Sequence, residues 1–145
     1  MDTDYQNACS LLRKHIEAFV KLPDTDWELL LPHLTLQSLQ KNQFFIQEGK
    51  KETRVGFVID GMLRQFYTKD GEEKTTYFFF ENHFMTSYVS CITGKPSLIT
   101  IEALSKVAYL SFPYHILQEL FERSMAWQKF GRLIAEYLGI GLEER

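Results

Sequence analysis

The sequence predicts a mainly β fold with flanking helices, contained in one domain of ordinary size. In the first 33 residues and again after residue 113, apolar residues recur every three or four positions, as in amphipathic helices. Between these segments the apolar residues follow a period of two, and Asp-Gly pairs separate the strand-like runs. A chain of 145 residues can build one core but not two. We therefore expect one structural domain with N-terminal helices over 1–33, a barrel over 34–113 and C-terminal helices over 114–145.

Two helices are expected before residue 34. The first extends from Asp4 to Lys21, and Pro23 ends it. Asp24 is placed to cap a second, short helix that carries Trp27 and ends at Pro32. The apolar face of the first helix consists of Tyr5, Ala8, Leu12, Ile16 and Phe19.

The two Asp-Gly pairs predict an antiparallel meander. Asp60-Gly61 and Asp70-Gly71 each stand between apolar runs, where this dipeptide favours a tight hairpin turn. Ser105-Lys106 joins two further strand-like runs. These five runs are residues 54–59, 62–68, 74–80, 98–104 and 107–112. The middle of the chain therefore predicts a sandwich or barrel of short strands.

Helices return near the end of the sequence. Pro113 suits a first helical turn, and Ser124 suits the cap of a last helix. Six residues of that helix form one apolar stripe: Trp127, Phe130, Leu133, Ile134, Tyr137 and Leu138. The stripe suits packing on the chain's own barrel or on a second copy. Gly131 either permits a close helix approach or weakens the helix.

Composition excludes several classes of function. The net charge is −3 and no run of basic residues occurs, which argues against this chain binding a nucleic-acid backbone by itself. Apolar stretches such as Tyr77–Phe80 are far shorter than the roughly 20 residues of a membrane span, and the N-terminus lacks the pattern of a signal peptide. We expect no membrane contact and a cytoplasmic location. Cys9 and Cys91 lie far apart and are expected to be reduced, buried thiols.

No arrangement of residues predicts catalysis or a metal site. The four histidines are scattered, without the close pairing that metal-binding barrels of the cupin kind require. No nucleophile lies beside a base in a recognisable motif. We therefore expect no catalytic residue, no metal and no enzyme activity, with a cupin-like metal enzyme as the alternative from another class.

Several turn and strand motifs together carry a resemblance to a known family. They are Gln47-Glu48-Gly49 after Phe44-Phe45-Ile46, the run Gly56–Arg64, Asp70-Gly71-Glu72-Glu73, Phe84, and Ile99–Leu104. In this order they resemble the effector domain of the CRP/FNR family of bacterial transcription regulators, over about residues 34–145. The resemblance implies a double-stranded β-helix jelly roll of the cyclic-nucleotide-binding kind, with N-terminal helices and a long C-terminal dimerisation helix.

The resemblance also places the family's phosphate-binding cassette. In the family an Arg clamps the cyclic phosphate, a Glu accepts a hydrogen bond from the ribose, and a Gly admits the ligand close to the backbone. The Gly-Glu pair falls on Thr86-Ser87, and the Arg falls on Ser97, or on Pro96 if the register differs by one. Losing one partner of a buried charged contact costs roughly 2 to 5 kcal/mol, or about 30-fold to several thousand-fold in affinity. Cyclic nucleotide, the cofactor that the family implies, is therefore disfavoured here.

A pocket-like segment remains around the altered cassette. Lys95 can reach a phosphate from the loop, but it is a poor replacement for the planar fork of an arginine. The candidate pocket consists of Phe84, Met85, Thr86, Ser87, Tyr88, Lys95, Ser97, Leu98, Ile99 and Thr100. Our hypothesis is that it binds a different, less anionic small-molecule effector or has become a ligand-free structural element. The alternative is a functional cyclic-nucleotide-binding module whose cassette is aligned differently.

The resemblance implies partners as well. In the family the last helix pairs with its twin, so we expect a homodimer through the stripe from Trp127 to Leu138, with Gly131 beside it. A family member continues beyond the position of Arg145 into a winged helix-turn-helix. We expect a fragment of a longer regulator, in which DNA is contacted only through a C-terminal domain not present in this chain. The ligand state of the barrel would then bias the angle of the paired helices.

Overall fold

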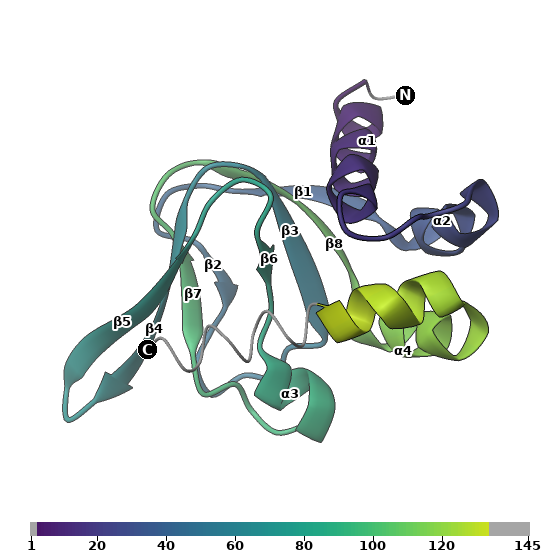
Figure 1. Cartoon of the computed structure of the whole chain (residues 1–145). Coiled ribbons are helices and arrows are strands. Elements are labelled where there is room, and N and C mark those ends of the chain that lie inside the picture. Colours follow the sequence, from purple (N-terminus) through teal and green to yellow (C-terminus); the bar gives the residue numbers. More distant parts are fainter. Residues whose placement is uncertain (1–2, 134–145) are drawn as a thin grey trace. The chain divides into compact units, whose positions relative to one another are not determined.

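The computed structural model describes residues 3–133 and confirms the predicted fold class: a mainly β jelly roll with flanking helices (Figure 1). The described residues fall into two compact units, Thr35–Tyr114 and the segments on either side of it. The helices are α1 (Thr3–Glu17), α2 (Asp24–Leu30), the 3-10 helix η1 (Leu31–His33), α3 (Tyr88–Thr93) and α4 (Tyr114–Arg123). The strands are β1 (Thr35–Leu39), β2 (Phe44–Ile46), β3 (Arg54–Asp60), β4 (Leu63–Lys69), β5 (Glu72–Phe79), β6 (Phe84–Met85), β7 (Thr100–Ala103) and β8 (Val107–Pro113).

The strands form two four-stranded antiparallel sheets. One has the order β1-β8-β3-β6 and the other the order β2-β7-β4-β5. Both sheets contribute side chains to one core, which therefore lies between them: Phe45, Ile46, Val58, Leu63, Phe79, Met85, Ile101, Ala103, Val107 and Tyr109. Gly56 of β3 lets this core close, because a Cβ at this position would lie 2.9 Å from Met85 Cε and 3.0 Å from Phe45 Cζ.

The predicted meander is wrong at Asp60-Gly61. The strands on either side of this pair, β3 and β4, belong to different sheets, so the pair carries the chain from one sheet to the other. Ser105-Lys106 makes the same kind of crossing between β7 and β8. Asp70-Gly71 does form the expected hairpin between β4 and β5, with φ of 54° and 80°. Positive φ at both central residues is the signature of a type I′ turn.

The two crossings pack against each other at one corner of the jelly roll. The amide of Met62 donates a hydrogen bond to Ser105 Oγ at 3.1 Å, and the amide of Leu104 donates to the Met62 carbonyl at 2.8 Å. Gly61 has φ of 102°, and a Cβ there would lie 2.4 Å from the carbonyl oxygen of Lys106. The glycine is required by this close approach and by the positive φ, not by a hairpin turn.

The N-terminal helices differ in detail from the prediction. α1 ends at Glu17, before the predicted boundary at Lys21. The cap of α2 is Pro23, without a side-chain hydrogen bond, so the predicted capping by Asp24 is wrong. Asp24 is instead the first helical residue, and its carboxylate lies 2.6 Å from the guanidinium of Arg13. A negative charge in the first turn still stabilises the helix through the macrodipole.

A last helix begins after Ser124, and residues 125–133 of it are described. Ser124 caps it as predicted, since its Oγ accepts the amide of Trp127 at 3.2 Å and donates to Asp26 Oδ1 at 2.6 Å. The indole of Trp127 donates to the Asp26 carbonyl at 2.9 Å. These contacts join the start of the last helix to α2.

The described part of the predicted apolar stripe is largely buried in the chain itself. Trp127 is 0% exposed, Phe130 is 4% exposed and Leu133 is half-buried. Gly131 serves a close approach, because a Cβ there would lie 2.6 Å from the ring of Phe121. The other three stripe residues, Ile134, Tyr137 and Leu138, lie outside the described residues. Pairing of this helix with a second copy stays a prediction.

None of the helices in residues 3–133 combines the length and the apolar character that crossing a bilayer requires.

Candidate functional site

The predicted pocket residues lie on the segment that runs from β6 through α3 to β7. They do not share one surface. Lys95 and Leu98 are exposed, the latter to 64%. Phe84, Thr86, Tyr88 and Ile99 are half-buried. Met85, Ser87, Ser97 and Thr100 are buried. The structure therefore brings the small hydroxyl side chains inward and leaves the lysine at the surface.

The hydroxyls of Thr86 and Ser87, which the resemblance aligns with the family's Gly-Glu pair, are engaged within the chain. Ser87 caps α3, since its Oγ accepts the amide of Ser90, and Gly94 ends the helix in the left-handed conformation. Thr86 Oγ1 donates to the carbonyl of Arg54 at 2.7 Å. Neither residue offers a carboxylate that could accept a hydrogen bond from a ribose hydroxyl.

Ser97, which the resemblance aligns with the family's arginine, is 2% exposed. Its hydroxyl donates to the Ile99 carbonyl at 2.8 Å and accepts the Ile99 amide at 3.1 Å. Its main chain pairs with the preceding loop, through Ser97 N–H to the Lys50 carbonyl and Gly49 N–H to the Ser97 carbonyl, both at 2.8 Å. Ser97 is therefore a buried anchor between two loops.

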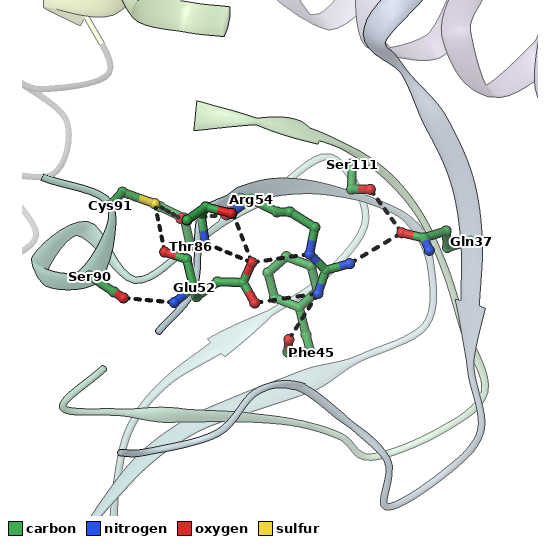
Figure 2. Close-up of polar contacts among 9 residues, drawn as sticks. Gln37, Phe45, Glu52, Arg54, Thr86, Ser90, Cys91 and Ser111 are labelled. Carbon is green, nitrogen blue, oxygen red and sulfur yellow. Dashed lines mark hydrogen bonds and ion pairs between the residues drawn. The ribbon is translucent and has the colours of Figure 1, made fainter. Parts of the chain in front are cut away.

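A polar cluster that the sequence did not single out lies beside this segment (Figure 2). Arg54 of β3 donates from Nε to Glu52 Oε1 at 3.0 Å, from Nη1 to Gln37 Oε1 at 3.2 Å, and from Nη2 to the Phe45 carbonyl at 3.3 Å. Its guanidinium carbon lies 4.8 Å from the centre of the Phe45 ring. Gln37 Oε1 also accepts the hydroxyl of Ser111 at 2.8 Å. Arg54 thus joins side chains or carbonyls from β1, β2 and the loop before β3.

The same cluster is tied to α3. The amide of Glu52 donates to Ser90 Oγ at 2.7 Å, and the Cys91 thiol donates to the Glu52 carbonyl at 3.5 Å. Cys91 Sγ also lies 3.3 Å from Thr86 Oγ1. Burial raises the pKa of the Cys91 thiol, so it stays protonated at neutral pH and serves as the donor. Three side chains of the segment therefore converge on Glu52 and Arg54, as Figure 2 shows.

The charges of this cluster are partly desolvated. The side chain of Glu52 is 13% exposed and that of Arg54 is 34% exposed. Burial opposes the charge on Arg54, but the hydrogen bonds and charge interactions with Glu52 and Tyr109 outweigh it and raise its pKa. The guanidinium therefore stays charged at every pH at which the protein is folded.

Sequence reasoning missed Glu52 and Arg54, although one signal was present. Arg54, Gly56 and Val58 alternate on β3, and Val58 belongs to the core between the sheets. A charged residue on the core-facing side of a strand needs a partner. The nearest carboxylate in the sequence, two residues earlier, supplies it.

Tyr88 provides a pH-dependent test of the packing around α3. Burial, with smaller contributions from Tyr114 and Cys91, raises the pKa of Tyr88 to about 12. An unfolded chain ionises this residue near its usual value of about 10. Between these two pH values the unfolded state has lost the proton and the folded state keeps it, so stability falls by about 1.4 kcal/mol per pH unit.

We expect Tyr88→Phe to abolish this part of the stability loss. The measurement is urea unfolding of both proteins at pH values from 9 to 11.5, in buffers of equal ionic strength. The control is Tyr67→Phe on β4. Equal pH slopes for wild type and Tyr88→Phe would contradict the burial of this phenol.

No metal site is found in the part of the chain that the structure covers. Among residues 3–133, no three or more His, Cys, Asp or Glu side chains are grouped so that they could hold a metal ion.

Comparison with solved structures shows the same fold in bacterial regulators. Catabolite Activator Protein from Thermus thermophilus has 17% identity and a TM-score of 0.72, over 87% of this chain and 58% of that protein. The sensor domain of the transcriptional regulator DNR from Pseudomonas aeruginosa has 16% identity and a TM-score of 0.72, over 88% of both chains. A cyclic nucleotide-binding domain from Methylobacillus flagellatus has 12% identity and a TM-score of 0.77, over 94% of this chain and 81% of that domain. At these identities the likeness establishes the fold alone.

Comparison of sequences gives the family. No curated protein sequence matches this chain. The sequence model of the cyclic nucleotide-binding domain matches residues 36–124, which is more than half of the chain and includes every strand except the start of β1. The chain therefore belongs to the cyclic nucleotide-binding domain family.

Proposed function

We propose that this chain is the effector-sensing and dimerisation domain of a CRP/FNR-like transcription regulator, with a cassette that does not bind cyclic AMP or cyclic GMP in the family's usual way. The family match and the regulators of the same fold support a regulatory role instead of a catalytic one. The observation that carries the proposal is Ser97. At the place of the phosphate-clamping arginine it is buried and hydrogen-bonded within the chain.

The remaining positions of the cassette support the same conclusion. Thr86 and Ser87 replace the Gly-Glu pair, and both hydroxyls are used inside the chain, one on the Arg54 carbonyl and one on the start of α3. Lys95 is exposed and makes no side-chain hydrogen bond that holds it toward the segment. At these cassette positions a cyclic nucleotide would therefore meet neither a preformed cation for its phosphate nor a carboxylate for its ribose.

The proposal includes an arrangement of the whole regulator. The two compact units act as one structural domain in the cytoplasm, and the last helix pairs with its twin in a homodimer. A DNA-binding domain, carried elsewhere in the regulator, makes the contact with DNA. An effector held in unit Thr35–Tyr114 would bias the paired helices between two arrangements.

The test is native mass spectrometry of the protein purified from a bacterial host that makes cyclic AMP. We expect the mass of the polypeptide alone in each protomer, and a dimer at tens of micromolar protein. A retained mass equal to that of a cyclic nucleotide would contradict the altered cassette. A monomer throughout the concentration range would contradict pairing through this chain.

A further inference from the structure

We propose that Arg54 is the anchor for the effector, and that it binds the oxyanion, a carboxylate or a phosphate, of a small and otherwise uncharged molecule. Glu52 acts as the internal counterion that this oxyanion displaces. The inference rests on the proposed sensing function and names the chemistry that the site would recognise. The lack of an arginine in the cassette led us to expect a less anionic effector. The position of Arg54 changes this expectation to an effector that carries an oxyanion.

Arg54 is the arginine of the strand-bearing unit that is open to a new partner. Residues 35–114 contain two arginines, Arg54 and Arg64. Arg64 is held by two separate carboxylates, Glu73 at 2.6 Å and Glu102 at 2.9 Å, and it belongs to the other sheet. Arg54 has one carboxylate partner, and its other neighbours are neutral: the Gln37 amide, the Phe45 carbonyl and the Tyr109 phenol.

The hydrogen bonds of Arg54 leave its planar fork loosely satisfied. The terminal nitrogens lie 3.2 Å from Gln37 Oε1, 3.3 Å from the Phe45 carbonyl and 3.4 Å from Glu52 Oε2. Charge-assisted bonds to a well-placed carboxylate or phosphate are shorter, about 2.7–2.9 Å, and usually come in parallel pairs. A free oxyanion can therefore satisfy this fork better than the groups that now surround it.

The surroundings of Arg54 combine access from solvent with partial desolvation of its charge. A third of its side chain is exposed, so an incoming molecule can reach the charge. The guanidinium carbon lies over the ring of Phe45, which is 3% exposed and belongs to the core between the sheets. A cation beside apolar surface attracts an oxyanion strongly, because part of the hydration is already removed.

Displacement of Glu52 would be transmitted to α3. Glu52 Oε1 accepts the amides of Thr53 and Arg54, at 3.0 Å and 2.8 Å, so the carboxylate also orders the chain before β3. The main chain of Glu52 holds Ser90 and Cys91 of α3. A ligand that removes the carboxylate from Arg54 therefore loosens the segment on which α3 is fixed. Binding and the position of α3 are then linked.

The internal carboxylate sets the expected affinity. A group tethered this close has an effective concentration of about millimolar or higher. A simple anion with no further contacts must compete with it, so it binds wild type only weakly, at about millimolar concentration or above. Removing the charge of Glu52 removes the competitor. We expect Glu52→Gln to bind the same anion at least about tenfold more tightly.

The experiment is an NMR titration of the 145-residue chain with sodium acetate and, separately, with inorganic phosphate, against sodium chloride at equal ionic strength. The readouts are the Nε–Hε resonance of Arg54 and the amide resonances of α3. We expect saturable shifts of both in wild type, a dissociation constant at least about tenfold lower in Glu52→Gln, and loss of saturation in Arg54→Lys. The matched control Arg64→Lys changes the other arginine of the unit and leaves the titration unaltered.

The outcomes separate this inference from the proposed function. Shifts that are linear and equal to those produced by chloride would overturn the assignment of Arg54, and so would saturation that survives in Arg54→Lys. Either result leaves the altered cassette untouched, because that claim is tested by cyclic nucleotides. If a variant does not fold, the titration of the wild-type protein is sufficient to test the assignment of Arg54. Whichever of acetate and inorganic phosphate binds with the lower dissociation constant shows whether the effector's oxyanion is a carboxylate or a phosphate.

Discussion

Gly61→Ala is expected to lower the free energy of unfolding by about 3 kcal/mol or more. Gly61 has φ of 102°, where an L side chain is strained by roughly 1–3 kcal/mol. Its new Cβ would also lie 2.4 Å from the Lys106 carbonyl and 2.9 Å from a methyl carbon of Val107. The carbonyl is main chain and cannot swing aside as a side chain can. Relief requires the two sheet crossings to move apart, which also strains the hydrogen bonds of Met62.

The matched control is Gly71→Ala in the β4–β5 hairpin. Gly71 has φ of 80°, but no atom lies within 4 Å of its added Cβ. Its expected loss is therefore the cost of the left-handed conformation alone, roughly 1–2 kcal/mol. Urea unfolding of both variants measures the difference. Equal losses at the two glycines would mean that the crossings do not pack as described.

Trp127→Ala is expected to destabilise the chain by about 3–5 kcal/mol. Trp127 is 0% exposed, and its removal leaves a cavity in the unit formed by the terminal segments. The same change removes the indole hydrogen bond to the Asp26 carbonyl. Since the side chain is buried within the chain, the loss is expected at every protein concentration.

Met125→Ala is the control for Trp127→Ala. Met125 begins the same helix and is 85% exposed, so its replacement is expected to change stability by less than about 0.5 kcal/mol. Thermal unfolding at two protein concentrations, one tenfold above the other, distinguishes stability that arises within one chain from stability that arises on dimerisation. A Trp127→Ala variant that matches wild type in the dilute sample and differs only in the concentrated one would contradict burial within the chain.

The strands were predictable because their side-chain period is local. The predicted runs 54–59 and 107–112 match β3 and β8 to within one residue at each end. Their pairing was not predictable from the same pattern, because a period of two shows which residues share a face and not which sheet the strand joins. Asp-Gly at positions 60 and 70 looks the same in sequence, yet only the second lies between paired strands. The helix cap at Ser124 was predictable since its partner, the amide of Trp127, is three residues away.

The candidate site also has one part that the sequence predicts and one part that it does not. From the sequence alone, the resemblance aligns Ser97 or Pro96 with the family's arginine and Thr86-Ser87 with its Gly-Glu pair. The cluster around Arg54 is not visible in the sequence, because it depends on contacts between distant positions. Thr86 reaches the Arg54 carbonyl across 32 residues, and Ser111 reaches Gln37 across 74. The pairing of β1 with β8, of β8 with β3 and of β3 with β6 brings these side chains together.

Calorimetric titration of the purified chain with cyclic AMP and with cyclic GMP tests the central claim most directly. With a buried serine in place of the clamping arginine, we expect no binding heat up to millimolar ligand. Binding of either nucleotide in the micromolar range would contradict the claim, because it would require a phosphate clamp that Ser97, Thr86 and Ser87 do not provide.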